Sequence, residues 1–398
     1  MTKVRTSFFL FLFLAGCLEA QQQYGWIQKA EFGGAARHRV TAESVGNRGY
    51  VGLGHINSVV DVLFDDWWEY DPGTDTWTQK ANFSGGPRFH CASFVIDNII
   101  YVGTGRDINA VLHQDFWKYD PSSNSWASVA SFPGAGRRGA VGFAINGYGY
   151  VGTGSGHQNF FRYDPGSDSW LQIASLPGAG RTSAVGFAIN GKGYVGTGDI
   201  GGPSGDMWEY DPASDTWTAK ANLPGLPRME AGGFVLDGKG YLGTGDDYSS
   251  GTNYQDFWCF DPQMNSWTQV ADFAGAARRY LSCFTIGNRA YAGLGTSGIN
   301  YADFWEYGSI SGTEEFTQDK TVSVFPDPAD QSAEISVENA EGEVSVLVLA
   351  SDGKCVARQP VVSGKASLDC SGLAPGIYFL QFSVSGKIFS NRKLVVRH

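Results

Sequence analysis

The chain has 398 residues, of which 14% are aromatic, with 54 glycines and 15 prolines. This length accommodates one large all-β domain and a second small one, and abundant glycine beside little proline favours many hairpins over disorder. The net charge of −11 excludes nucleic acid as the main partner, because phosphate binding requires a basic surface.

Residues 1–20 have the features of a secretory signal peptide, since Lys3 and Arg5 precede an apolar core at 8–15 and then small residues. The core is too short to span a bilayer, and no other segment predicts a transmembrane span. Two processing routes are open. Residues 14–17, Leu-Ala-Gly-Cys, resemble a bacterial lipobox, which would place a lipid on Cys17. Cleavage after residue 20 would instead leave Gln21 first.

From residue 37 onward, one unit recurs six times. An arginine is followed thirteen positions later by a tyrosine and then by a string such as Val-Gly-Thr-Gly. The six arginines are Arg37, Arg88, Arg137, Arg181, Arg228 and Arg278. Between arginine and tyrosine lie an apolar run and a two-residue breaker such as Asn146-Gly147, which accepts positive φ at low cost. Each copy therefore predicts a hairpin of two strands, a and b.

A second half-unit follows each hairpin. The string Asp-Trp-Trp-Glu-Tyr-Asp-Pro at 66–72 has four later counterparts and a shortened sixth copy at 303–307. These predict strand c, and a strand d with a tryptophan follows the five complete copies. The tryptophans Trp77, Trp126, Trp170, Trp217 and Trp267 are 49, 44, 47 and 50 residues apart. Such four-stranded units cannot cover their own faces, and radial stacking into a β-propeller is the expected solution.

The segment around Trp26 matches strand d, yet no strands a to c precede it, whereas the copy at 303–307 lacks a strand d. The N-terminal strand is therefore expected to complete the last blade. This predicts a closed ring of six blades over residues 21–307, without an open edge.

The tyrosine and tryptophan spacing and the glycine pair resemble the kelch-repeat family over about seven-tenths of the chain. The pair is split here, as in Gly103-Thr-Gly105, which looks like exported bacterial kelch proteins. The resemblance implies an all-β, six-bladed kelch propeller. It carries no function of its own, because propellers serve many.

Residues 308–320 read as a polar linker, and 321–398 as a small β-sandwich domain. Four strings resemble the C-terminal sorting domain of the Bacteroidetes type IX secretion system: 324–329, 351–354, 373–379 and 393–396. The family usually has Asn where this chain has Asp327, and both residues suit the turn. The resemblance implies the type IX machinery as a partner and a secreted or cell-surface protein. Such cargo commonly begins with a cyclised glutamine, which favours cleavage before Gln21.

Six cysteines are few for an exported chain of this size. Three lie within predicted strands, namely Cys91, Cys259 and Cys283, and are expected to be small buried residues. Cys355 and Cys370 could form one disulfide in an oxidising compartment. No zinc-type spacing occurs, and neither metal nor cofactor is expected.

The start of strand a, the end of b and the start of c share one face of the ring, and the b–c connections there vary in length and content. Binding residues favour such loops. The six arginines are expected to ring the channel mouth on this face as ligand-binding residues for carboxylate, sulfate or phosphate. The favoured alternative is that each pairs with the residue that opens strand c, namely Asp66, Asp115, Asp206, Asp256 or Asp303. In blade three that residue is Asn159, so Arg137 is expected to be free for a ligand.

The residues two positions after the arginines differ among blades: Arg39, His90, Gly139, Ser183, Glu230 and Tyr280. A ligand site would be specified at such positions. His90 and Glu230 are capable of acid–base chemistry but are expected to lie across the ring from each other.

The leading hypothesis is a non-catalytic binding or scaffold protein that engages protein or glycan through this face. The alternative is an enzyme resembling the six-bladed kelch N-acetylneuraminate mutarotases. A sugar acid would then bind at the arginine-lined mouth, with Glu230, His90 or both moving the proton.

Overall fold

The computed structural model describes residues 23–57, 61–248, 250–310, 322–338, 344–350, 355–384 and 387–397, and these form strands and no helix. The predicted signal peptide, Cys17 and residues 311–320 of the predicted linker lie outside the described residues. The chain divides into two compact units, of which one is Tyr24–Ile310 and the other contains the C-terminal strands. No helix suited to crossing a membrane is present in the described ranges.

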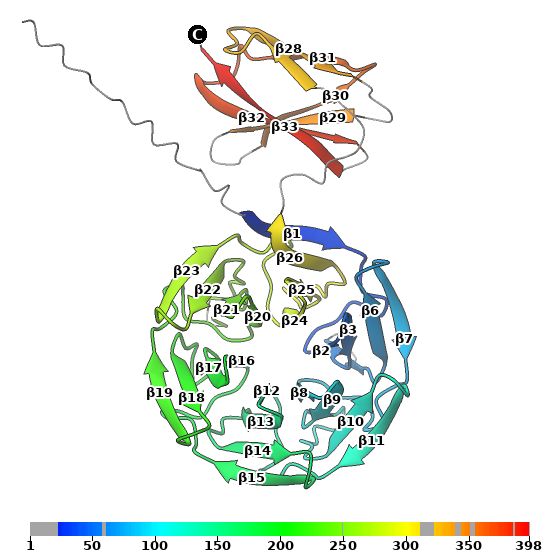
Figure 1. Cartoon of the computed structure of the whole chain (residues 1–398), viewed down its shortest axis with the longest axis vertical. Coiled ribbons are helices and arrows are strands. Elements are labelled where there is room, and N and C mark those ends of the chain that lie inside the picture. The colour runs from blue at the N-terminus through cyan, green and yellow to red at the C-terminus, as the bar shows by residue number, and fades with distance from the viewer. Residues whose placement is uncertain are drawn as a thin grey trace, which may run out of the picture. The chain divides into compact units, whose positions relative to one another are not determined.

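The first unit is a ring of six four-stranded antiparallel sheets around a common axis, as the sequence predicted (Figure 1). From the axis outward, blade one consists of β2 (Thr41–Val45), β3 (Arg48–Gly52), β6 (Trp67–Asp71) and β7 (Thr76–Lys80). Blade two consists of β8 (Ala92–Ile96), β9 (Ile99–Gly103), β10 (Phe116–Asp120) and β11 (Ser125–Val129). Blade three consists of β12 (Ala140–Ile145), β13 (Tyr148–Thr153), β14 (Phe160–Asp164) and β15 (Ser169–Ile173). Blade four consists of β16 (Val185–Ile189), β17 (Lys192–Gly196), β18 (Met207–Asp211) and β19 (Thr216–Lys220). Blade five consists of β20 (Gly232–Leu236), β21 (Lys239–Gly243), β22 (Phe257–Asp261) and β23 (Ser266–Val270). Blade six consists of β24 (Ser282–Ile286), β25 (Arg289–Gly293), β26 (Phe304–Ile310) and β1 (Gln23–Lys29). A short pair, β4 (His55–Ile56) and β5 (Val62–Leu63), lies in the b–c connection of blade one.

The sixth blade has the order β1-β26-β25-β24, so the N-terminal strand closes the ring and the closure prediction is confirmed. A repeated hydrogen bond joins each blade to its neighbour. The strand-d tryptophan donates its indole N–H to the carbonyl of the alanine that directly follows strand d of the preceding blade, at 2.8–3.3 Å. Trp26 makes the same bond, to Ala271, at 3.3 Å. The tryptophans are thus blade-packing residues, and the N-terminal strand is packed like the other five.

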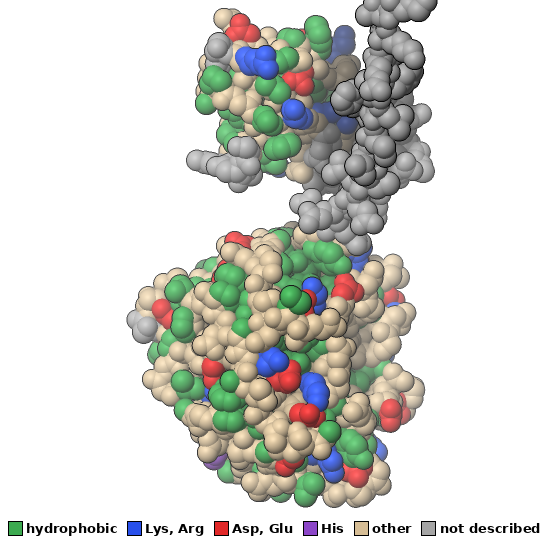
Figure 2. All heavy atoms as spheres, turned by 60° about the vertical axis from the view of Figure 1, so that its left-hand side comes forward, with side chains coloured by type: hydrophobic (Ala, Val, Ile, Leu, Met, Phe, Trp, Pro, Cys, Tyr) green, Lys and Arg blue, Asp and Glu red, His purple; other side chains and the backbone are tan. Residues whose placement is uncertain are grey.

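The blades pack through large aromatic side chains set against residues that are small enough to receive them. In five blades a phenylalanine six positions after the ring arginine is buried and stacks near the tyrosine of its own blade, as Phe94 does with Tyr101 at a centroid distance of 5.1 Å. Four of these phenylalanines lie over a glycine of the next blade, for example Phe94 over Gly149, where an added Cβ would lie 2.2 Å from the Phe94 ring. On the outside, acidic and basic side chains are interspersed on the face drawn in Figure 2.

The C-terminal unit has a three-stranded sheet and a four-stranded sheet that share one apolar core. The first has the order β27 (Val322–Phe325), β28 (Ser332–Val337), β31 (Lys365–Asp369), and the second β30 (Cys355–Val361), β29 (Val344–Ala350), β32 (Gly376–Val384), β33 (Lys387–Val396). Cys355 is exposed, Cys370 is buried, and both are free thiols, so a disulfide between them is not formed. Cys91, Cys259 and Cys283 are half-buried rather than buried.

Candidate functional site

The six ring arginines are at most 1% exposed. In five blades the guanidinium donates to the aspartate that opens strand c, as the favoured alternative predicted. The bonds are Arg37–Asp66 at 2.6 Å, Arg88–Asp115 at 2.6 Å, Arg181–Asp206 at 2.6 Å, Arg228–Asp256 at 2.7 Å and Arg278–Asp303 at 2.5 Å. These guanidiniums are buried and already paired with a carboxylate. The geometry therefore gives the predicted anion-binding collar no support, and the pairs join strand a to strand c.

In blade three the residue that opens strand c is Asn159 rather than an aspartate, but Arg137 is still buried. Arg137 donates to the amide oxygen of Asn159 at 2.9 Å and to two backbone carbonyls. Its Nη2 atom is buried without a hydrogen-bond partner. Because no carboxylate offsets the burial, the pKa of Arg137 falls to about 10.

The residues two positions after the ring arginines lie at the channel mouth, and all six have positive φ, between 55° and 63°. In five of the six residues the backbone N–H donates to the carbonyl of the corresponding residue in the previous blade. The chain of bonds runs from His90 to Arg39, Gly139 to His90, Ser183 to Gly139, Glu230 to Ser183 and Tyr280 to Glu230, over 2.7–3.1 Å. The strained conformation thus belongs to the ring architecture, while the side chains at these positions are free to differ.

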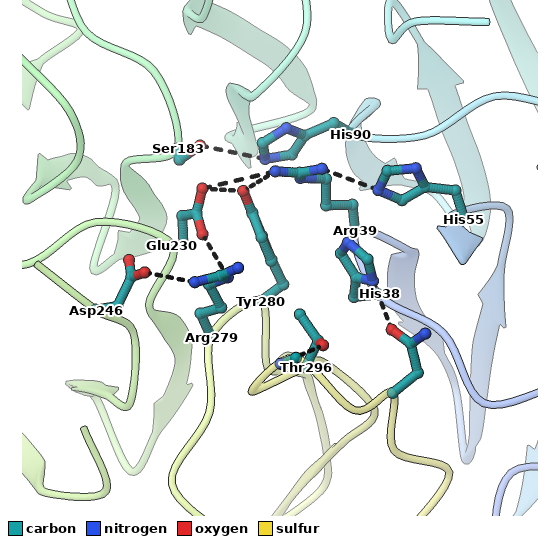
Figure 3. Close-up of polar contacts among 12 residues, drawn as sticks. His38, Arg39, His55, His90, Ser183, Glu230, Asp246, Arg279, Tyr280 and Thr296 are labelled. Atoms are coloured by element: carbon teal, nitrogen blue, oxygen red, sulfur yellow. Dashed lines mark hydrogen bonds and ion pairs between the residues drawn. The ribbon is translucent and has the colours of Figure 1, made fainter. Parts of the chain in front are cut away.

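Three of those side chains, Arg39, Glu230 and Tyr280, form a polar network across the mouth (Figure 3). Arg39 donates to the Tyr280 hydroxyl, which in turn donates to the Glu230 carboxylate. Arg279 lies 3.3 Å from the other oxygen of Glu230 and 2.9 Å from Asp246. The network joins blades one, five and six, and it places a carboxylate, a phenol and two guanidiniums within contact of one another.

Glu230 lies in blade five, as expected, and the residue of blade two that approaches Tyr280 is His90. Its ring is 5.4 Å from the ring of Tyr280, and its Nε2 is 3.4 Å from the Ser183 hydroxyl. Burial and the nearby charge of Arg39 lower the pKa of His90 well below its usual value. Burial raises the pKa of Glu230 to about 7 despite the attraction of Arg39. The cluster therefore contains a neutral imidazole beside a carboxyl group that titrates near neutrality.

A second tier adjoins this network and shares Arg279 and Asp246 with it. It consists of the residues that follow each ring arginine and those five positions after each repeat tyrosine. His38 and His55 pair in an isolated bridge, and Arg39 contacts His55 Nε2 at 2.9 Å. Burial lowers the pKa of His38 to about 4 and that of His55 to about 2, so both imidazoles are neutral at pH 7.

Two guanidiniums of this tier, those of Arg106 and Arg138, are half-buried and have no hydrogen-bond or ion-pair partner among the described residues. They lie close enough that burial, Arg39 and Arg106 together lower the pKa of Arg138. They belong to blades two and three, and the b–c connection of blade three is short. The sequence did not point to Arg106 and Arg138, because attention went to the arginines that recur in every blade. The position after each ring arginine, which holds Arg138, varies among the blades as visibly as the position two after it.

Comparisons with known proteins agree with both units. Residues 323–397 match the model of the secretion system C-terminal sorting domain. A solved structure titled "Structure of YjhT" superimposes with a TM-score of 0.59 at 20% identity, covering 69% of this chain and 95% of that chain. A search of curated proteins gave no match. The chain therefore carries a type IX sorting domain, which directs it to the cell surface or the extracellular space, and its main domain has a propeller fold.

Proposed function

We propose that the protein is a secreted or surface-exposed, non-catalytic binding protein of kelch type whose loop-rich face holds an acidic partner. The observation that carries the proposal is the pair of unpaired guanidiniums, Arg106 and Arg138, at the mouth of the ring. Arginine presents a planar fork of donors suited to carboxylate, sulfate and phosphate groups. The six buried ring arginines would hold this face in shape rather than contact the partner.

Exposed apolar side chains on the same loops favour a protein over a glycan. They come from connections of five blades and are Val62, Ile108, Val111, Leu112, Ile200, Leu226, Tyr248 and Ile299. Ile299 and Tyr248 are each 72% exposed. All but one of these side chains are aliphatic, which suits the apolar core of a protein interface.

The test is a panel of displayed peptides and a glycan array, both probed with the full-length protein. We expect acidic peptides with apolar neighbours to bind, and Arg138→Ala to weaken them at least tenfold, since a charge-assisted contact is worth about 1.5–3 kcal/mol. Arg48→Ala is the matched control, because Arg48 is a half-exposed cation paired with Asp71 at the opposite end of blade one. Ligands that bind the Arg138→Ala variant as tightly as the parent would place the binding surface elsewhere.

A second function, a mutarotase-like epimerase acting on a sugar acid, is favoured by the cluster of Glu230, Tyr280 and His90. The hypothesis of a non-catalytic protein assumed that such groups do not converge, and here Tyr280 bridges Glu230 to Arg39 beside His90. A general base with a pKa near the working pH is efficient, and the pKa of Glu230 is about 7. Arg138 and Arg106 would hold the substrate carboxylate.

Anomeric equilibration of N-acetylneuraminate, followed by NMR, tests the enzyme. If Glu230 is the base, the rate should rise about tenfold between pH 6 and pH 8, because the reactive carboxylate becomes populated across its pKa. Glu230→Gln should remove the acceleration, about 10²–10⁴-fold for a lost general base, and leave binding by Arg138 in place. A parent protein that does not accelerate equilibration is no mutarotase.

A further inference from the structure

Blade three differs from the other five blades at two positions of strand c, and both changes affect the ring arginine. The residue that opens the strand is Asn159 rather than an aspartate, and the residue two positions later is Phe161 rather than a tryptophan. The tryptophans at the second position of the other blades are Trp68, Trp117, Trp208, Trp258 and Trp305. Each donates its indole N–H to the aspartate of its own blade, at 2.6–2.9 Å. Blade three thus lacks the carboxylate and also the indole donor that accompanies it.

The ring arginine of blade three has an unused donor. In blades two, four, five and six the guanidinium donates through both terminal nitrogens, and its Nη2 bonds the second carboxylate oxygen at 2.7–3.1 Å. In Arg137, Nη1 donates to Asn159 at 2.9 Å, and Nη2 is buried without a partner. Nη2 of Arg37 in blade one also lacks a partner, but that guanidinium has the charge of Asp66 at 2.6 Å. Blade three alone among the six described blades combines an unused guanidinium donor with a neutral partner.

The guanidinium of Arg137 nevertheless carries its charge. Burial lowers the pKa of Arg137 only to about 10, so the side chain is protonated at pH 7. Its acceptors among the described residues are two backbone carbonyls and one amide oxygen, all of them neutral. A buried charge without a counter-ion is unfavourable. The blade would therefore gain stability from an anion taken up from solvent.

Solvent can reach this position. The aspartates that open strand c in the other blades have side chains that are 17–34% exposed, and Asn159 is likewise half-buried. Because a guanidinium only donates, the amide oxygen of Asn159 faces Arg137, and the amide nitrogen is the other polar atom of the side chain. This nitrogen has no acceptor among the described residues. Two donors on side chains that already contact each other are thus available to one anion.

We propose that blade three binds a small monovalent anion, chloride or the carboxylate group of a small acid, at Arg137 and Asn159. The anion supplies the charge that the strand-c aspartate supplies in the other blades. It accepts hydrogen bonds from Nη2 of Arg137 and from the amide nitrogen of Asn159, and bonds from a charged donor are the stronger kind. The site is distinct from the pair Arg106 and Arg138 and does not rest on the function proposed for that pair.

The test measures how the stability of the propeller depends on the anion. All 12 tryptophans lie within Tyr24–Ile310, so urea unfolding of the full-length protein, followed by tryptophan fluorescence, reports on this unit. Sodium chloride and sodium acetate are each compared with sodium isethionate, a larger anion, at the same ionic strength. An anion at about 20 times its dissociation constant should raise the ratio of folded to unfolded protein about 20-fold. We expect chloride, acetate or both to produce such a rise, and the comparison identifies which.

Asn159→Asp gives blade three the carboxylate that the other blades have. This variant should be at least as stable in isethionate as the parent is in the stabilising anion, and that anion should stabilise it no further. The folded parent should also broaden the NMR resonance of the anion, and Asn159→Asp should not. In blade five, Asp256→Asn combined with Trp258→Phe reproduces the residues of blade three. A folded protein with this pair of substitutions should show a second anion dependence of similar size.

Two outcomes would overturn the proposal. One is a parent protein that is equally stable in chloride, acetate and isethionate. The other is an anion effect of the same size in the parent and in Asn159→Asp. If that effect is lost in Arg138→Ala instead, the anion binds at the channel mouth, which would leave the proposed function standing and remove the site in blade three.

Discussion

Asp256→Ala is expected to lower the free energy of unfolding by about 3–5 kcal/mol, the range for breaking one side of a buried ion pair. Arg228 is fully buried and donates to both carboxylate oxygens of Asp256 at 2.7 Å. The alanine variant would leave this guanidinium charged in the interior of blade five with two backbone carbonyls as its remaining acceptors. It would also remove the acceptor for the indole N–H of Trp258. Urea unfolding at pH 7, followed by tryptophan fluorescence, measures the change.

The dependence of this loss on pH identifies its cause. Burial alone would raise the pKa of Asp256, but the bonds from Arg228 and Trp258 outweigh it and lower the pKa below the usual value. A depressed pKa stabilises the fold above the pKa of the unfolded chain, about 3.9, and the stabilisation is lost as the pH falls through the folded pKa. The difference between parent and Asp256→Ala should therefore shrink below about pH 4.

Blade three offers the matched control, because Asn159 occupies the position at which the other blades have an aspartate. Asn159→Ala removes one neutral acceptor from Arg137, and a loss of about 1–2 kcal/mol is expected. Arg137 already tolerates this environment, with a pKa of about 10. If Asp256→Ala costs no more than Asn159→Ala, the aspartates are not required as counter-ions, and the case for the ring arginines as ligand-binding residues would return.

The architecture could be predicted from the sequence because the evidence for it repeats. The ring arginine recurs six times and the aspartate that opens strand c recurs five times, which implies a contact between them. The hydrogen bond from Arg228 to Asp256 is one example of that contact. An isolated strand d at Trp26 and a missing one after residue 307 imply closure, which β1 provides. Repetition turns a weak local pattern into a strong constraint, since each copy tests the others.

The site could be predicted only in part, because its residues are the ones that do not repeat. Their positions were identifiable, but distances across the mouth depend on how far each side chain reaches. Tyr280 is long enough to link Arg39 to Glu230, so residues of blades one, five and six meet.

Trp26→Ala is expected to cost about 3–5 kcal/mol, the range for truncating a packed tryptophan, although the residue lies near the start of the described chain. Its ring is 5.0 Å from Phe273, 4.9 Å from Tyr307 and 5.3 Å from Phe257 by centroid, and its indole N–H bonds to Ala271. The contact with Tyr307 holds β1 on β26, and the contacts with Phe257, Phe273 and Ala271 hold it against blade five, so Trp26 fixes the strand that joins the two ends of the ring. Their loss should lower the urea midpoint and also speed unfolding in stopped-flow measurements, because a released β1 leaves β26 as an open edge.

Ile27→Ala is the control on the same strand, since Ile27 points outward and is 46% exposed. Its substitution should change stability by less than about 0.5 kcal/mol. Trp217→Ala supplies a second comparison, because Trp217 makes the equivalent bond to Ala174 at 2.9 Å between two blades formed by continuous chain. If closure by the N-terminal strand is what locks the ring, Trp26→Ala should accelerate unfolding more than Trp217→Ala at equal loss of equilibrium stability. Equal unfolding rates would mean that the ring opens at every boundary alike, and that the sixth blade has no special role in its kinetic stability.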